Sequence, residues 1–241
     1  MKKGIVTIAF DDAYLDTLRH AVRYLNRLKI PSTIAVPHDL IGKKLEKRPV
    51  AGRRELKNAL DRGHEIASHT LTHRNLLRLS SQDYGETITE ISASKKFLEN
   101  TLNARVDSFV FPYIEYNQSR KLRSIAKKYY KTSRITSYVP CFNKTPLRNP
   151  YFVKGFAVMK KHAISYLNRQ IDHAARNKLW LIEVFHLVAE KNTLSAHRPE
   201  AYRFFMQIKD FKEHIRYILS RDIIIMTQGE VVRQSSRNIS R

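Results

Sequence analysis

Short runs of consecutive apolar residues alternate along the chain with longer stretches in which apolar residues recur every three or four positions. Short runs of this kind are typical of buried strands, and the periodic stretches are typical of amphipathic helices. The pattern predicts strands over 4–10, 32–36, 64–68, 108–112, 130–135, 151–159, 179–185 and 222–227. It predicts helices near 14–28, 52–62, 82–101, 118–129, 163–177 and 205–220, the third with a capping box formed by Ser80 and Asp83.

Strand and helix alternate some seven times in 241 residues, which favours an α/β fold with a parallel sheet. The sheet is either a barrel, with functional side chains at the ends of several strands, or a doubly wound sheet with one switch point. The chain contains neither an internal repeat nor a convincing linker. We therefore expect a single domain over 1–241, with 234–241 as a flexible tail.

Composition supports a packed globular protein, because 42% of the residues are hydrophobic and 11 Phe and 12 Tyr are present. The single cysteine, Cys141, excludes an internal disulfide. The opening residues "MKKGIVTIAF" have the basic and apolar parts of a signal peptide but lack a small-residue cleavage site, so we interpret them as the first strand. No apolar stretch is long enough to span a membrane. A cytoplasmic protein is expected, with peripheral membrane association left open.

Charge adds a preference for anionic partners. Lys and Arg number 44 against 22 acidic residues, a formal net charge of +22. Such an excess attracts an anionic substrate, a membrane surface or nucleic acid. The basic residues form small clusters along the chain, however, and a solvated basic surface explains them equally well.

Two adjacent carboxylates, Asp11 and Asp12, follow the first predicted strand. Asp12 could cap the next helix, but Asp11 would be costly at a strand end unless it is paired, hydrated or bound to a cation. The segment "GHEIASHTLTH" places His69 and His73 four residues apart, on one face if the turn is helical. Because the strand ends of a parallel barrel share one rim, these side chains predict a metal site with a position open to water. One Asp would bind the metal and the other would take a proton from the water.

Two of these segments resemble a known family. "IAFDD" and "HTLTH" closely resemble the first two motifs of the polysaccharide deacetylases, the NodB-type carbohydrate esterases, written T-F-D-D and H-[ST]-x-x-H, with Ala9 in place of the usual Thr. The resemblance implies that Asp11 is the general base. It implies that Asp12, His69 and His73 bind a divalent metal.

Further segments extend the resemblance over most of the chain. "SFVFPYIEYN" at 108–117 resembles the third motif: Pro112 and Tyr113 match as substrate-binding residues, and the Tyr113 N–H would help to hold the oxyanion. The family's Arg would fall at Val110, and its Gly at Ile114. "LIEVFHLV" resembles the L-x-H motif and assigns the general acid to His186. The fourth motif is not placed, because the spacing of Asp172 and Trp180 does not match it.

The resemblance implies a distorted barrel of about seven β/α units. It implies a hydrolase that removes an N-acetyl or other acyl group from an amino sugar in a glycan or lipid-linked saccharide. One divalent ion is implied, zinc first, with cobalt, nickel or iron as alternatives. The competing hypothesis is a catalytically impaired barrel that binds anionic polymer or nucleic acid through its basic surface. Because no groove-reading motif is visible, a nucleic acid partner is not expected.

Overall fold

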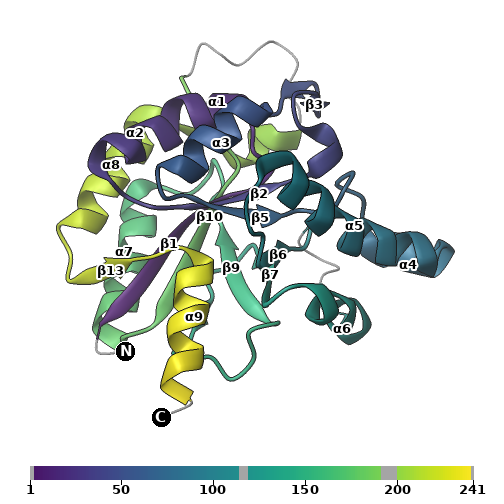
Figure 1. The fold of residues 1–241 in the computed structure, drawn as a ribbon. Helices are drawn as coiled ribbons and strands as arrows, with labels where there is room; N and C mark the ends of the chain where they lie inside the picture. Colours follow the sequence, from purple (N-terminus) through teal and green to yellow (C-terminus); the bar gives the residue numbers. More distant parts are fainter. Residues whose placement is uncertain (1–2, 114–118, 191–199, 240–241) are drawn as a thin grey trace.

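The computed structural model describes residues 3–113, 119–190 and 200–239 of the chain. In these residues, parallel strands form a closed ring in the order β1, β2, β5, β6, β7, β9, β10, and β10 pairs back with β1 (Figure 1). The ring confirms the α/β barrel and excludes the open sheet. Its strands are β1 (Gly4–Phe10), β2 (Thr33–Val36), β5 (Glu65–Ser68), β6 (Ser108–Val110), β7 (Thr132–Ser137), β9 (Val153–Ala157) and β10 (Trp180–Phe185).

Shorter strands border this ring. A fragment of antiparallel strand adds to β10, and another strand pairs in parallel with the first half of β1. Two further pairs form small sheets outside the ring. These strands are β8 (Phe142–Asn143) on β10, β13 (Ile223–Ile225) on β1, β3 (Lys44–Leu45) with β4 (Arg48–Pro49), and β11 (Leu187–Ala189) with β12 (Phe205–Gln207).

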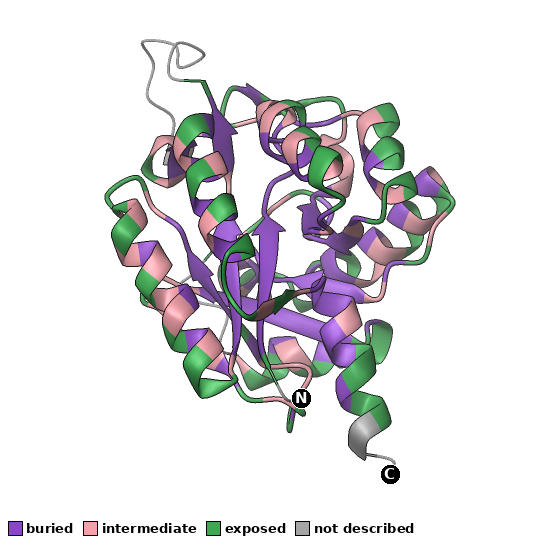
Figure 2. Cartoon of the chain, turned by 90° about the vertical axis from the view of Figure 1, so that its left-hand side faces the viewer, coloured by how far each residue is buried: buried purple, intermediate pink, exposed green. Residues whose placement is uncertain are grey.

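Helices surround the ring and bury the outer face of its strands, and the inner faces are buried against one another inside the ring. Every residue of β1 and β10 is buried, which explains why these strands read as continuous apolar runs. Figure 2 shows buried strands at the centre and exposed residues on the outer sides of the helices. The helices are α1 (Leu15–Thr17), a π-helical turn η1 (Leu18–Val22), α2 (Arg23–Leu28), α3 (Arg53–Asp61), α4 (Leu76–Gln82), α5 (Tyr84–Leu102), α6 (Arg120–Tyr129), α7 (Ile164–Asn177), α8 (Ile208–Leu219) and α9 (Gln228–Ile239), with 3₁₀ turns η2 (His38–Leu40) and η4 (Glu200–Phe204).

Two predictions about the helix ends are wrong. The capping box fails because α4 occupies 76–82 and includes Ser80; Asp83 alone caps α5, accepting a hydrogen bond from the Glu86 N–H at 2.8 Å. The helix expected from residue 205 begins at Ile208, because residues 205–207 pair with β11. The helix expected near 14–28 is present over 15–28, and it contains a π-helical turn at 18–22.

The expected tail at 234–241 is also helical as far as Ile239. Its helix, α9, is held at its start: the Gly229 N–H donates to the Glu65 carboxylate at 2.9 Å, and the Gln228 N–H donates to the Thr33 hydroxyl at 2.9 Å. Its own residues Val231 and Val232 are buried. These hydrogen bonds to the starts of β2 and β5 and this burial explain why α9 is helical where the polar composition predicted a flexible tail.

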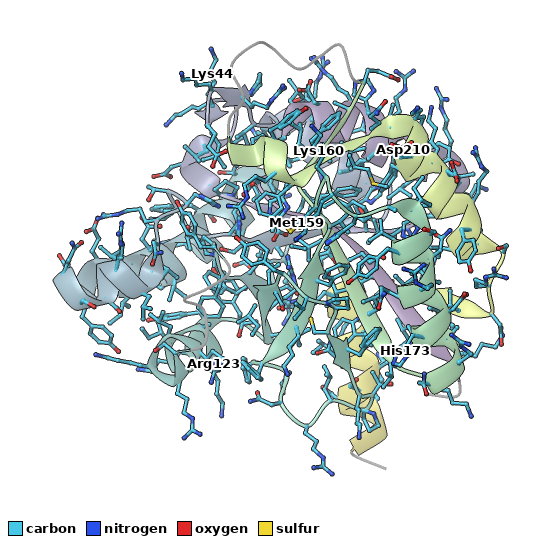
Figure 3. All side chains as sticks on the ribbon, turned by 180° about the vertical axis from the view of Figure 1, so that it is seen from behind. Lys44, Arg123, Met159, Lys160, His173 and Asp210 are labelled. Atoms are coloured by element: carbon cyan, nitrogen blue, oxygen red, sulfur yellow. The ribbon has the colours of Figure 1, made fainter. Side chains whose placement is uncertain are left out.

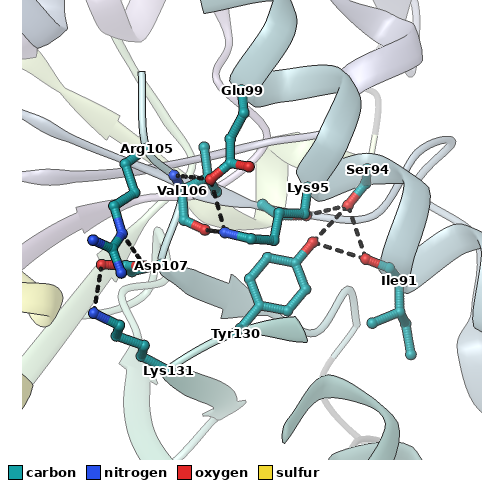
Figure 4. Close-up of polar contacts among 10 residues, drawn as sticks. Ile91, Ser94, Lys95, Glu99, Arg105, Val106, Asp107, Tyr130 and Lys131 are labelled. Atoms are coloured by element: carbon teal, nitrogen blue, oxygen red, sulfur yellow. Dashed lines mark hydrogen bonds and ion pairs between the residues drawn. The ribbon is translucent and has the colours of Figure 1, made fainter. Parts of the chain in front are cut away.

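A polar network ties α5 to the strands that carry part of the rim (Figure 4). The Tyr130 hydroxyl donates to the Ile91 carbonyl at 2.8 Å, and the Ser94 hydroxyl lies 3.0 Å from it. The Glu99 carboxylate accepts the Val106 N–H at 2.9 Å, just before β6. These buried bonds fix the position of β6 and β7 relative to the helix layer.

A buried histidine makes the stability of the fold depend on pH. His64 Nδ1 accepts the Ser32 N–H at 3.1 Å, and its Nε2 lies 2.9 Å from Asn26 Oδ1, so the neutral ring is fully bonded. Burial first, and then the charge of Arg62, lowers the pKa of His64 to about 4. Because the unfolded chain binds its proton at the ordinary pKa near 6.5, stability falls as the pH drops from 6.5 towards 4.

We expect His64 to contribute up to about 3 kcal/mol to this loss. Urea unfolding of the wild type and of His64→Gln at pH 7 and pH 4.5 measures it, because only the wild type titrates at this position. The free energy of unfolding of the wild type should fall more steeply between the two pH values. Equal losses of unfolding free energy in the wild type and in His64→Gln would show that His64 is not the source of the pH dependence.

Candidate active site

The carboxyl ends of the ring strands place two histidines around one carboxylate. Asp12 Oδ1 lies 3.1 Å from His73 Nε2 and 3.5 Å from His69 Nε2. One possible ligand atom from each residue lies within 4.8 Å of the others. Asp12 follows β1, and both histidines follow β5, so the barrel brings together side chains almost 60 residues apart. These are the three ligands predicted from the sequence.

The histidines do not lie on a helical turn as their spacing suggested. Residues 69–75 form a loop in which Thr70 and His73 have positive φ angles, 68° and 62°. The His73 N–H donates to the Thr70 hydroxyl at 3.0 Å. The Glu90 carboxylate of α5 accepts the N–H groups of Leu71 and Thr72 at 2.9 and 3.0 Å. Hydrogen bonds to this carboxylate, rather than helical geometry, hold both rings at the site.

The donor set fits a divalent cation. His69 Nδ1 lies 2.8 Å from the Val110 carbonyl and therefore donates its proton there, which leaves the Nε2 lone pair directed at the site. Asp12 Oδ1 is buried and has no hydrogen-bond partner of proper geometry in the described part of the chain. Burial alone would raise the pKa of Asp12, but His73 and then His69 outweigh it and hold the pKa well below its usual range. An ionised oxygen and two imidazole nitrogens form an open tripod of the kind that binds catalytic zinc.

Asp11 forms an ion pair that the sequence analysis missed. Its Oδ1 accepts a hydrogen bond from Arg134 Nη2 of β7, and the Arg134 Nη1 donates to Thr136 Oγ1 at 2.8 Å. Arg134 has 0% and Asp11 3% of its surface exposed. The pair explains how a carboxylate can stand at a buried strand end.

A glycine makes room for this arginine. A Cβ atom on Gly155 of β9 would lie 2.8 Å from Val184 Cγ2 and 3.0 Å from Arg134 Nη1. Both distances are shorter than ordinary contacts, so a larger residue here would displace the Val184 side chain and the Arg134 guanidinium. Gly155 is therefore part of the support of the Asp11–Arg134 pair.

His186 follows β10 at the same rim. The Asp11 N–H donates to the Phe185 carbonyl at 2.9 Å, which places the ends of β1 and β10 side by side. The His186 ring stacks on Phe204 with centroids 4.4 Å apart, and its Nδ1 is shielded from solvent. Burial lowers the pKa of His186, and the carboxylates of Asp12 and Asp11 partly offset that effect.

The third predicted segment also reaches the site. Pro112 is buried, whereas Tyr113 has 49% of its surface exposed and a positive φ angle of 61°. The Tyr113 ring centroid lies 5.2 Å from that of His73. Ile114, where the family pattern has Gly, lies outside the described residues.

Comparisons with known proteins show the family of this chain. Residues 1–132 match the family model described as polysaccharide deacetylase, which is more than half of the 241 residues. The chain belongs to the polysaccharide deacetylase family. It is 28% identical over 131 residues to YxkH of Bacillus subtilis (strain 168), whose name places it among the polysaccharide deacetylases; the match covers 54% of this chain and 44% of that relative.

Solved structures show the same fold at low sequence identity. The Xyl-CE4 domain of a multidomain xylanase, from the hindgut metagenome of Trinervitermes trinervoides, has a TM-score of 0.61 and 14% identity, with 98% of this chain and 92% of that chain covered. A CE4 family pseudoenzyme from Bacillus anthracis has a TM-score of 0.59 and 13% identity, with 96% and 66% covered. Because a pseudoenzyme shares the fold, the activity of this deacetylase-family chain has to be argued from its own residues.

Several lining residues of the deacetylase-family site carried no signal in the sequence. Tyr14 is buried, and its pKa is raised by burial and then by the Asp12 carboxylate, so its hydroxyl stays protonated beside the site. The exposed Glu46 of the β3–β4 turn lines the cavity, as do Tyr138 and Phe204. Glu46 lies in a turn and Phe204 in a short 3₁₀ segment, and no periodic pattern predicts either.

No helix in the described residues is both long and apolar enough to cross a membrane.

Proposed function

We propose that this chain is a metal-dependent hydrolase that removes an N-acetyl or other acyl group from an amino sugar in a glycan or lipid-linked saccharide. The proposal rests on one observation. A tripod of Asp12, His69 and His73 shares the rim with the Asp11–Arg134 ion pair and with His186. A ligand set, a positioned base and a candidate acid at one cavity are what hydrolysis of an amide requires.

Asp12, His69 and His73 would hold one divalent ion. Zinc is the first choice because it binds mixed imidazole and carboxylate ligands with a position left open, and cobalt, nickel and iron are alternatives. When bound, such an ion lowers the pKa of a water molecule and polarises the acyl carbonyl. The Val110 carbonyl fixes the tautomer of His69, and so maintains its capacity to bind.

The remaining roles fall on residues that follow three different strands, β1, β6 and β10. Asp11, held by Arg134, takes a proton from the attacking water. The backbone N–H of Tyr113 donates to the oxyanion that develops on the acyl carbonyl, an interaction worth about 3–4 kcal/mol in comparable sites. His186 gives a proton to the departing amine nitrogen, and its position beside Phe204 keeps the ring in place.

The competing hypothesis of an impaired barrel drew on the absence of an arginine at position 110. An arginine at position 110 would be expected to hold Asp11. Arg134 of β7, the strand next to β6, forms an ion pair with the Asp11 carboxylate, which weakens this support for an impaired barrel. No observation among the described residues favours an inactive protein.

Release of acetate from a panel of N-acetylated saccharides, with and without chelator, tests the proposal. We expect release to stop with chelator and to return when a divalent ion is added back. Metal content should be about one ion per chain and should be lost in the Asp12→Ala, His69→Ala double variant, whose thermal unfolding shows whether it is folded. His173→Ala, an exposed histidine of α7, is the matched control. Full metal occupancy in the double variant would contradict the ligand assignment.

A further inference from the structure

A groove rich in arginine lies between the first helical segment and α3, away from the active site. It has a volume of about 600 Å³ and separates η1 and α2 from α3. These helices cross the upper part of the barrel in Figure 1. Its charged side chains are Arg19, Arg23, Arg27, Arg54, Arg62 and a single carboxylate, Glu55. We call it the arginine groove.

Ion pairs within the described residues do not neutralise the arginines of the groove. In the described residues, Arg19, Arg23, Arg27 and Arg54 form no ion pair, and Arg62 donates to the Asn58 side chain at 2.8 Å. Five guanidinium groups facing one carboxylate repel one another, which is a cost to the fold when nothing neutralises them. Five of the 44 basic residues of the chain therefore line one groove.

The π-helical turn aligns one wall of the groove. Arg19, Arg23 and Arg27 follow one another at intervals of four residues. In a regular α-helix, which turns once in about 3.6 residues, side chains at this interval drift around the axis. The π-helical turn at Leu18–Val22 is wider than an α-helical turn, and in it the Arg23 N–H bonds back to the Leu18 carbonyl. This wider turn counteracts the drift between Arg19 and Arg23. All three side chains therefore line the same groove, roughly 6 Å apart along the axis.

We infer that the arginine groove binds a linear polyanion made of phosphodiester-linked polyol or sugar units. A row of guanidinium groups on one wall, with Arg54 and Arg62 on the other, suits an extended chain whose charges recur at regular intervals. Among the described residues that line the groove none is aromatic, so it offers no surface on which nucleic acid bases could stack. Its concave form suits a single chain better than a flat bilayer. The inference does not depend on the proposed function, because binding is measured without turnover.

The test is binding of fluorescently labelled poly(glycerol phosphate) to the full chain, followed by anisotropy. The Arg23→Glu, Arg54→Glu variant reverses one charge on each wall. The matched control is Arg169→Glu, Arg176→Glu on α7, which changes the net charge equally; α7 is marked by His173 in Figure 3, the view from behind. All four arginines are exposed, so both variants should fold.

We expect the groove variant to bind at least about tenfold more weakly than the wild type, and its affinity to fall less steeply with salt. The control variant should bind within about twofold of the wild type. Equal losses in the two variants would show that diffuse charge alone attracts the polymer and would overturn the inference.

Three further probes separate the alternatives. Inorganic phosphate should compete only weakly, because it contacts one or two guanidinium groups rather than the row. Tighter groove-dependent binding of oligothymidylate than of poly(glycerol phosphate) would overturn the inference in favour of nucleic acid. Groove-dependent binding of phosphatidylglycerol vesicles that the soluble polymer does not displace would also overturn the inference. That result would favour a membrane surface.

Discussion

Replacement of Asp11 by Asn is expected to lower kcat by about 10²–10⁴-fold without loss of bound metal. The amide cannot accept a proton from water, whereas its oxygen can still accept a hydrogen bond from Arg134, so the site geometry is largely retained. The tripod of Asp12, His69 and His73 is unchanged. Deacetylation rates, with metal content and thermal unfolding measured on the same samples, distinguish a lost base from a lost ion or a lost fold.

The control for this variant is Asp222→Asn, which removes an exposed carboxylate paired with Lys3. It should leave kcat and metal content unchanged, since exposed ion pairs contribute little to stability. Near-normal turnover in Asp11→Asn would mean that another group takes the proton. In that case the Asp11–Arg134 pair would be structural.

Replacement of Arg134 by Gln should lower the free energy of unfolding by about 3–5 kcal/mol. The variant leaves the buried Asp11 carboxylate without its cation, and the loss of one partner of a buried pair costs far more than the loss of both. Urea unfolding of Arg134→Gln, Asp11→Asn and the double variant forms a double-mutant cycle that measures the coupling. We expect the double variant to be more stable than Arg134→Gln.

Kinetics separate positioning from stability in this variant. If Arg134 positions the base, Arg134→Gln should lower kcat more than it raises KM, and Arg134→Lys should restore part of kcat. Gly155→Ala should act in the same direction, because its added methyl group contacts the guanidinium. A variant that is destabilised but has an unchanged kcat would contradict the positioning role.

Much of the fold follows from local pattern. The ring strands correspond to apolar runs, because both faces of a parallel barrel are buried and strand sequence therefore lacks alternation. The tripod also follows from local sequence: Asp12 follows one strand, His69 and His73 follow another, and strand ends meet at one rim. The loop conformation of the histidines was predicted wrongly, because it depends on Glu90, which is 17 residues beyond His73.

Arg134 could not be found in the same way. It lies 123 residues from Asp11, in a strand where one basic residue resembles any other surface charge. The only local signal was an arginine inside an otherwise apolar and hydroxyl-bearing run, "TSRITS", followed 21 residues later by Gly155. The contributions of Tyr14, Tyr138 and Phe204 to the cavity depend similarly on contacts between distant segments.

The Asp11–Arg134 pair joins opposite walls of the barrel, because β1 and β7 are separated by two strands on one side of the ring and by three on the other. Parting these walls at the rim would expose two opposite charges that are now buried together. Local fraying of the strand ends, common where backbone meets solvent, is therefore costly at this end of the barrel. If the proposed function is right, we expect the motions that admit a saccharide and release its product to come from the surrounding loops rather than from the ring.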